Sequence, residues 1–203
     1  MRKLFLLAAI AMLLLTSSAF ADNIIFDLSP ANGFTNRSAG SGVGQGVSVQ
    51  TTQTINDMEF YLNLPNGGDL KFFIYNGAND DLLYLQEVKG IGASDNPSWV
   101  SSPEFSFTLL AGQTYYFGVI SDAQASIGYI FPPVDYSSNG LTALTSGNSN
   151  YTGYGVPVFS GFGSAEIALR LSQAAQVPEP GSIALLGTGV LGLAGVLRRK
   201  LNL

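Results

Sequence analysis

The middle of the chain alternates apolar and polar side chains, and short stretches of Gly, Asn, Asp or Pro interrupt this alternation every eight to twelve residues. In residues 58–64 every second side chain is apolar, and residues 65–68 then supply a turn. A period of two is that of a β-strand with one buried face, and Gly, Asn and Pro are common in tight turns. The pattern predicts strands over residues 58–64, 70–75, 82–88, 105–109, 113–120 and 167–171.

No segment between residues 22 and 176 has the period of an amphipathic helix. Eight to ten short strands in about 150 residues are the number expected of two packed sheets. The predicted fold class is therefore all-β, a two-sheet sandwich of jelly-roll-like type, in a single domain of residues 22–176. Two stretches rich in Gly, Ser and Asn, residues 30–46 and 132–155, are expected to be long loops.

The first 21 residues have the three parts of a secretory signal peptide. Two basic residues follow the initial Met, residues 4–15 form an apolar run, and the small residues Ala19 and Ala21 provide a cleavage site. Twelve apolar residues are short for a membrane span, which argues against a retained helix. We expect a signal peptidase to remove residues 1–21, so that Asp22 becomes the N-terminus.

The last 27 residues are ordered as an extended motif, an uncharged segment and a basic end. Residues 177–181 contain two prolines, which cannot continue a helix or a central strand. Residues 182–197 carry no charge and would form a transmembrane helix of about 24 Å, slightly shorter than the roughly 30 Å hydrocarbon core. The basic end is expected to stay in the cytoplasm, which leaves the middle domain outside the inner membrane. It consists of Arg198, Arg199 and Lys200.

Residues 177–203, a Val-Pro-Glu-Pro-Gly segment, a Gly- and Leu-rich helix and an Arg-Arg-Lys end, resemble the PEP-CTERM sorting domain. This tail is sometimes labelled an ice-binding-protein C-terminal domain. The resemblance implies that an exosortase, an integral-membrane transpeptidase, recognises a sorting motif made of Pro178, Glu179 and Pro180. It also implies a Gram-negative bacterium that makes exopolysaccharide or biofilm matrix, and a protein anchored transiently in the inner membrane before it reaches the cell surface or the medium. An ordinary C-terminal anchor with an incidental Pro-Glu-Pro is the alternative.

The acidic charge of the middle domain and the absence of Cys and His exclude several classes of function. Residues 22–176 contain four basic and 13 acidic residues, a net charge of −9, which repels phosphate backbones and argues against a nucleic-acid partner. The chain has no Cys and no His. Disulfides, thiol nucleophiles, Ser-His-Asp triads and the usual zinc sites are thereby excluded, and no cofactor is expected.

A sugar-binding surface needs flat aromatic rings beside polar side chains. The candidates for contact with a polysaccharide are Trp99, Tyr61, Phe73 and Tyr75. The last three fall on the solvent phase of their predicted strands, whereas Trp99 is at least equally suited to fill the core. Residues 55–120, with an Ile-Tyr strand end, a Trp-containing segment and a Leu-x-Ala-Gly-x-Thr-Tyr-Tyr run, are also loosely similar to the carbohydrate-binding-module sandwiches of adhesins and matrix proteins.

The loop after the second predicted strand gathers oxygen-bearing side chains, the ligand type that Ca²⁺ requires. They are Asn76, Asn79, Asp80 and Asp81. Their spacing is not that of an Asp-x-Asp-x-Asp-Gly calcium loop, and a solvated hairpin turn accounts for them equally well.

Catalysis would have to depend on carboxylates, and a glycosidase needs two of them at a suitable separation. The candidates are Glu59, Glu87, Glu104 and Glu166. No motif pairs them, so we expect a non-enzymatic protein of the cell envelope or extracellular matrix that contacts exopolysaccharide. A secreted glycan hydrolase and a purely structural surface protein remain the alternatives.

Overall fold

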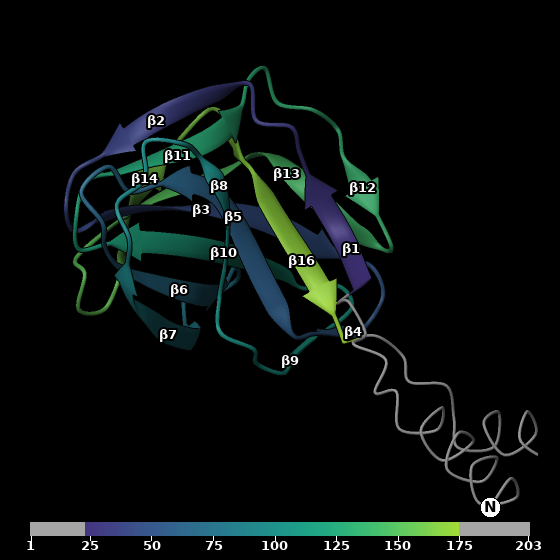
Figure 1. Cartoon of the computed structure of the whole chain (residues 1–203). Coiled ribbons are helices and arrows are strands. Elements are labelled where there is room, and N and C mark those ends of the chain that lie inside the picture. Colours follow the sequence, from purple (N-terminus) through teal and green to yellow (C-terminus); the bar gives the residue numbers. More distant parts are fainter. Residues whose placement is uncertain (1–22, 175–203) are drawn as a thin grey trace, which may run out of the picture. The chain divides into compact units, whose positions relative to one another are not determined.

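The computed structural model of the chain describes residues 23–174 (Figure 1). Every regular element within this range is a strand, so the predicted all-β class is confirmed. Residues 23–174 contain no helix with the length and apolar character of a membrane span. The predicted signal peptide, the sorting motif and the membrane helix over residues 182–197 lie outside the described residues.

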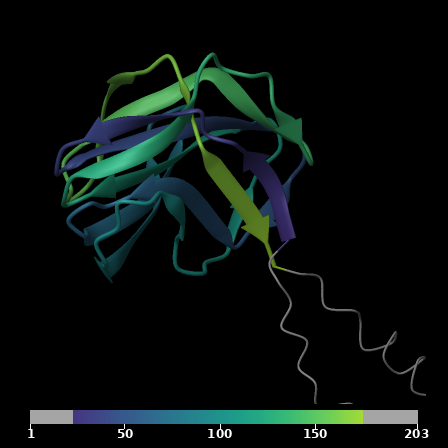
Figure 2. The same ribbon diagram turned by 45° about the horizontal axis from the view of Figure 1, so that its top comes forward.

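The first large sheet, here called sheet A, has seven antiparallel strands. Its path is β1 (Asn23–Leu28), β16 (Leu169–Gln173), β5 (Asp57–Asn63), β11 (Ala125–Ile130) and β15 (Glu166–Ile167). Two further strands pair with this path, β2 (Gly33–Arg37) with β11 and β8 (Ser98–Ser101) with β5. The purple β1 and the yellow-green β16 lie side by side in both ribbon views (Figures 1 and 2).

The second large sheet, here called sheet B, also has seven antiparallel strands. Its path is β12 (Ser137–Ser138), β13 (Leu141–Thr152), β3 (Ser41–Val49), β10 (Thr114–Ser121), β6 (Gly68–Asn76) and β7 (Leu82–Ile91), and β14 (Val158–Phe162) pairs with β13. A small separate sheet joins β4 (Gln53–Ile55) to β9 (Phe107–Leu109). In Figure 1, β5 and β16 cross in front of β3, β10 and β6, so sheets A and B form two layers.

The core lies between sheets A and B. Phe60 of β5 and Phe72 of β6 are fully buried, and their ring centroids are 6.2 Å apart. On β5 the side chains of Phe60 and Leu62 point inward and those of Glu59 and Tyr61 point outward, as their alternation predicts. Fully burying a side chain of this size contributes about 1.5–3 kcal/mol, so the inward rows hold the two sheets together.

The predicted loop over residues 30–46 is wrong, because β2 and most of β3 lie there. Glycine was taken as a turn signal, but in β3 it marks places where a ring approaches the backbone. A Cβ at Gly44 would lie 2.9 Å from the ring of Tyr151, and one at Gly46 would lie 2.9 Å from the ring of Tyr116. These glycines therefore create space for aromatic side chains on the outer face of sheet B.

The predicted loop over residues 132–155 is also wrong, because β12 and the 12-residue β13 occupy most of it. Polar residues of β13 that suggest a loop are buried in the sheet, and Asn148 pairs with Gln45 of β3. The buried amide group of Gln45 is satisfied by the backbone, since its Oε1 accepts from the Ile167 amide at 2.8 Å and its Nε2 donates to the Leu144 carbonyl at 3.2 Å. The eight to ten strands expected are therefore too few, and the jelly-roll connectivity stays a prediction.

Candidate functional site

A row of aromatic side chains crosses the outer face of sheet A. Phe34 on β2 pairs with Gly128 on β11, and Tyr61 on β5 pairs with Trp99 on β8. The pairing of β11 with β5 places Gly128 beside Tyr61, so one row runs across four neighbouring strands. The Tyr61 and Trp99 ring centroids are 5.3 Å apart with their planes tilted by 49°, and those of Phe34 and Tyr61 are 5.9 Å apart. Below, these three side chains are called the aromatic row.

A shallow depression opens beside this row, with a volume of about 240 Å³. The connection between β1 and β2 forms one side of it, and Trp99, Tyr61 and Arg170 form the other. Gly128 allows that connection to lie close to the sheet, because a Cβ there would stand 2.9 Å from the Ala31 Cβ. The residues that line the depression are Ser29, Pro30, Ala31, Tyr61, Trp99 and Arg170.

Arg170 fixes the indole from one side. Its guanidinium carbon lies 3.9 Å from the centre of the Trp99 ring, a cation–π contact. The same guanidinium is held by Asp27, with Nε to Oδ1 at 3.0 Å, and lies 4.0 Å from a carboxylate oxygen of Glu59. The Ser101 hydroxyl donates to Glu59 at 2.8 Å. The indole is thus oriented by a polar row made of Asp27, Arg170, Glu59 and Ser101.

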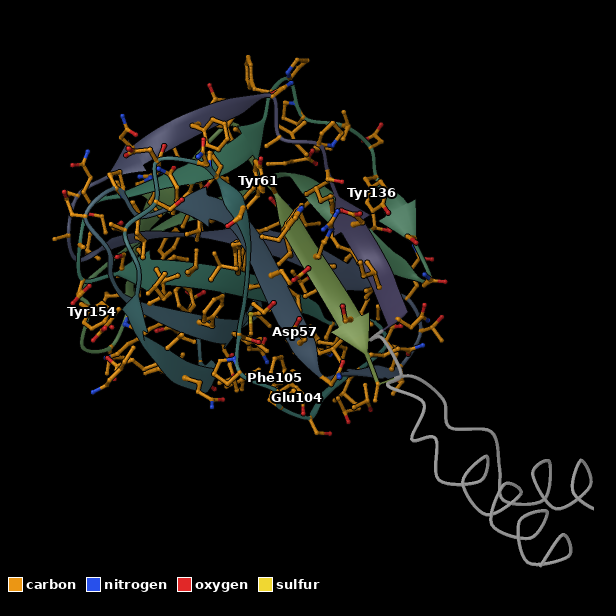
Figure 3. The ribbon with its side chains drawn as sticks, in the orientation of Figure 1. Asp57, Tyr61, Glu104, Phe105, Tyr136 and Tyr154 are labelled. Atoms are coloured by element: carbon orange, nitrogen blue, oxygen red, sulfur yellow. The ribbon has the colours of Figure 1, made fainter. Side chains whose placement is uncertain are left out.

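Trp99 is half-buried on the outer face of sheet A and does not belong to the core between the sheets. Tyr61 is half-buried as well and lies on the sheet that faces the viewer in Figure 3. Two of the four residues predicted to contact a glycan are therefore neighbours on an accessible surface.

The other two predicted glycan contacts, Phe73 and Tyr75, are on sheet B and are buried, so their placement on an exposed surface is wrong. The Tyr75 ring stacks on Tyr151 with centroids 5.5 Å apart, and its hydroxyl donates to the carbonyl of Pro157. Phe73 contacts the edge of the same Tyr151 ring at 4.7 Å. A second hydrophobic cluster thus covers the outer face of sheet B.

The connection between β13 and β14 covers this second cluster. Lys71 on β6 fastens it, because its Nζ donates to the carbonyls of Tyr154 at 2.9 Å and Gly155 at 3.0 Å and lies 4.4 Å from the centre of the Tyr154 ring. The Tyr154 hydroxyl in turn donates to Glu87 of β7 at 2.9 Å. Burial, the hydrogen bond to Glu87 and the charge of that carboxylate all raise the pKa of Tyr154, so the phenol stays neutral and keeps donating.

The loop proposed for calcium is a hairpin turn whose side chains bond within the loop. The Asn76 Oδ1 accepts from the Ala78 amide at 2.8 Å, and the Asn79 Oδ1 accepts from the Asp81 amide at 3.3 Å. The Asn79 Nδ2 donates to the Asp81 carboxylate at 2.6 Å, and Asp80 has a positive φ of 55°. These contacts are those of Asx turns, and residues 23–174 contain no group of three or more His, Cys, Asp or Glu arranged for a metal.

The four candidate catalytic glutamates have separate surroundings. Glu59 contacts Arg170, Glu87 contacts Lys89 and Tyr154, and Glu104 is exposed in the connection between β8 and β9. Figure 3 places Glu104 at the opposite end of β5 from Tyr61. Glu166 is fully buried and accepts from the Val134 amide at 2.9 Å.

Sequence reasoning missed Phe34, because it lies in the stretch taken as a loop. It also missed the roles of Arg170 and Asp27, which are far apart in the sequence and meet only because β1 pairs with β16. The alternation of residues 167–171 predicts that the Arg170 side chain points outward, but it does not predict the contact with the Trp99 indole.

No curated protein matches the sequence of the chain. Among solved structures, a carbohydrate-binding module of Cellvibrio mixtus lichenase 5A, in complex with cellotriose, is similar at 15% identity with a TM-score of 0.32. The match covers 54% of this chain and 94% of the module. A similarity of this size assigns no ligand and no site to the chain.

Residues 176–200 match the model of the PEP-CTERM protein-sorting motif, which confirms the resemblance inferred from the proline motif, the uncharged segment and the basic end. The chain therefore carries a PEP-CTERM protein-sorting signal, which implies an exported protein that an exosortase sorts.

Proposed function

We propose that residues 23–174 form a non-catalytic polysaccharide-binding domain, which the PEP-CTERM tail delivers to the cell surface or the extracellular matrix. The observation that carries this proposal is the pair of Tyr61 and Trp99 beside an open depression, with centroids 5.3 Å apart. A row of polar side chains adjoins the pair on the same face of sheet A.

The chemistry of the two rows matches the two kinds of surface on a sugar. The aromatic row offers ring faces to the C–H groups of a pyranose, and aromatic side chains provide such contacts at little cost in conformational entropy. The carboxylates of Asp27 and Glu59 and the Ser101 hydroxyl are placed to hydrogen-bond hydroxyl groups. An apolar surface with a few fixed polar groups is the usual composition of a ligand site.

The carboxylates near the depression favour binding over hydrolysis. Asp27 and Glu59 both contact the Arg170 guanidinium, and a glycosidase would need one carboxyl group to act as an acid and the other to act as a base or nucleophile across the scissile bond. A hydrolysis assay on each glycan that binds separates the proposal from the hydrolase alternative. Release of reducing ends that depends on Glu59 would contradict it.

The binding proposal is tested by a glycan array on the full chain purified in detergent, followed by affinity measurements for Trp99→Ala. Loss of the indole should weaken polysaccharide binding about tenfold or more, which corresponds to about 1.4 kcal/mol or more. The matched control is Phe162→Ala, which removes an aromatic ring that is 66% exposed on β14 of sheet B. Equal affinities for the two variants, or no binding by the parent protein, would overturn the proposal.

Delivery is tested separately, by replacing Pro178, Glu179 and Pro180 with alanines. Membrane insertion depends on the hydrophobicity of residues 182–197 and should be unchanged, whereas processing by the exosortase should stop. The measurement is the ratio of processed to unprocessed protein in membrane and medium fractions. Processing of this variant at the parental rate would contradict the sorting role of the motif.

A further inference from the structure

A second depression lies at the C-terminal end of β2, with a volume of about 300 Å³. It shares no lining residue with the depression beside Trp99. Four of its five lining residues have polar side chains. The residues that line it are Asn36, Arg37, Ser38, Ala39 and Gln124.

Arg37 differs from the other three basic residues of the described domain. Lys71 donates to two carbonyls, Lys89 lies 3.2 Å from Glu87, and Arg170 lies 3.0 Å from Asp27. Within residues 23–174, the Arg37 side chain has neither an ion pair nor a hydrogen bond, and its Nε is buried without a partner. A donor of a charged group without a partner costs stability, so this guanidinium would gain from an acceptor. The buried Nε is closed to other molecules, and Nη1 and Nη2 are the nitrogens left to meet one.

Two neutral side chains beside Arg37 are also free to donate. Neither the Asn36 nor the Gln124 side chain has a hydrogen bond to another described residue, and both are exposed. The Ser38 hydroxyl is 3.1 Å from the Ser41 hydroxyl, and one of the two protons stays available. Donors of this kind around one guanidinium suit a carboxylate, which takes two parallel hydrogen bonds from an arginine.

We infer that this depression binds a carboxylate group of an acidic polysaccharide, one that contains uronic acid units. The inference rests on the proposed function and specifies its ligand. Phe34 of the aromatic row and Asn36 of the depression lie on the outer face of β2, about 7 Å apart at two residues' rise, whereas Arg37 lies on the opposite phase of that strand. A single glycan chain that contacts the aromatic row must therefore pass over the edge of β2 that does not pair with β11 to bring a carboxylate to Arg37.

The net charge of the domain makes this arrangement selective. Residues 22–176 carry a net charge of −9, which repels an anionic chain at a distance, but charges farther than the Debye length of about 8 Å are largely screened at physiological salt. An acidic glycan therefore gains only where a cation meets its carboxylate directly. Among the basic residues of the described domain, Arg37 is the one whose charge is not already engaged.

The test compares oligogalacturonate with an uncharged galactose oligomer of the same length, titrated into the full chain in detergent. The parent protein should prefer the acidic oligomer by about tenfold, or about 1.4 kcal/mol. Arg37→Gln should remove this preference and leave the affinity for the uncharged oligomer unchanged. The matched control is Lys89→Gln, which removes one positive charge elsewhere on the domain and should keep the preference.

The outcomes separate this inference from the proposed function. If Arg37→Gln keeps the full preference, or if Lys89→Gln loses it equally, the Arg37 site is refuted while polysaccharide binding stands. If no oligomer binds but free galacturonate does so in an Arg37-dependent way, the depression takes a small carboxylate and the polysaccharide proposal fails. Unchanged thermal unfolding of Arg37→Gln is required for either conclusion, and Arg37→Lys, which keeps the charge and loses the planar fork, replaces it if that variant unfolds.

Discussion

The second hydrophobic cluster on the outer face of sheet B is buried, whereas the aromatic row on the outer face of sheet A is accessible. On sheet B the rings of Phe73, Tyr75 and Tyr151 pack on one another and are covered by the connection between β13 and β14. On sheet A, Tyr61 and Trp99 stay half-exposed beside a depression. An outward aromatic residue on a strand thus joins a second hydrophobic cluster where a connection covers it and stays accessible where none does.

The largest effect should come from the covered face. Phe73 is fully buried, so Phe73→Ala should lower the free energy of unfolding by about 3–5 kcal/mol through lost burial and the cavity left behind. Trp99→Ala removes a half-buried ring and should cost clearly less. Chemical denaturation of both variants measures the contrast, and equal losses would show that the two faces are covered alike.

A smaller loss of stability should follow when a side chain fills the space beneath the Phe73 ring. A Cβ at Gly118 would stand 2.1 Å from two carbon atoms of that ring, so Gly118→Ala should destabilise the domain by about 1–3 kcal/mol. Gly92→Ala is the control, because nothing lies within 4 Å of a Cβ at that position. A stable Gly118→Ala variant would mean that Phe73 is free to move outward and that the face is not closed.

Loosening the cover itself should have a still smaller effect. Lys71→Met removes two hydrogen bonds and the contact with the Tyr154 ring, which together are worth about 1–2 kcal/mol. Amide hydrogen exchange in residues 153–156 should accelerate, while exchange in β5 and β16 of sheet A should not change. Lys89→Met, which alters an exposed pair with Glu87, should leave the exchange rates unchanged.

The smallest expected effect is a change in the pH dependence of stability, and it concerns the buried carboxyl group of Glu166. Glu166 is fully buried, and burial raises its pKa above the ordinary value of 4.5. Because the folded state favours the protonated form, its contribution to stability is present at low pH and is lost as pH rises through the raised pKa. Glu166→Gln should therefore flatten the fall in unfolding midpoint as the pH rises above the ordinary value of 4.5. A steeper fall would show that the ionised form is the stabilising one.

Alternation along the chain was enough to predict the all-β class and the inward and outward phases of β5, β6 and β16. It failed where small and polar residues pack tightly inside strands, as Gly44 does beneath Tyr151 and Asn148 does beside Gln45. Such residues contact parts of the chain that are distant in the sequence. The alternation of apolar and polar residues within one segment does not reveal these contacts.

The site was predictable to the same limited extent. Tyr61 and Trp99 could be named from residue type and phase, whereas the burial of Phe73 and Tyr75 depends on a connection about 80 residues further along the chain. Arg37 could be read as one of few basic residues, but its lack of a partner is a property of the folded domain.

The most direct test of the open face uses the intrinsic fluorescence of Trp99, which is the single tryptophan of the chain. Its emission reports on the proposed site alone, so titration of the full chain with a bound polysaccharide should give a saturable shift or quenching whose midpoint equals the dissociation constant from calorimetry. Phe162→Ala should reproduce the curve. Binding by calorimetry without any change in Trp99 emission would place the glycan elsewhere and contradict the assignment of the site to sheet A.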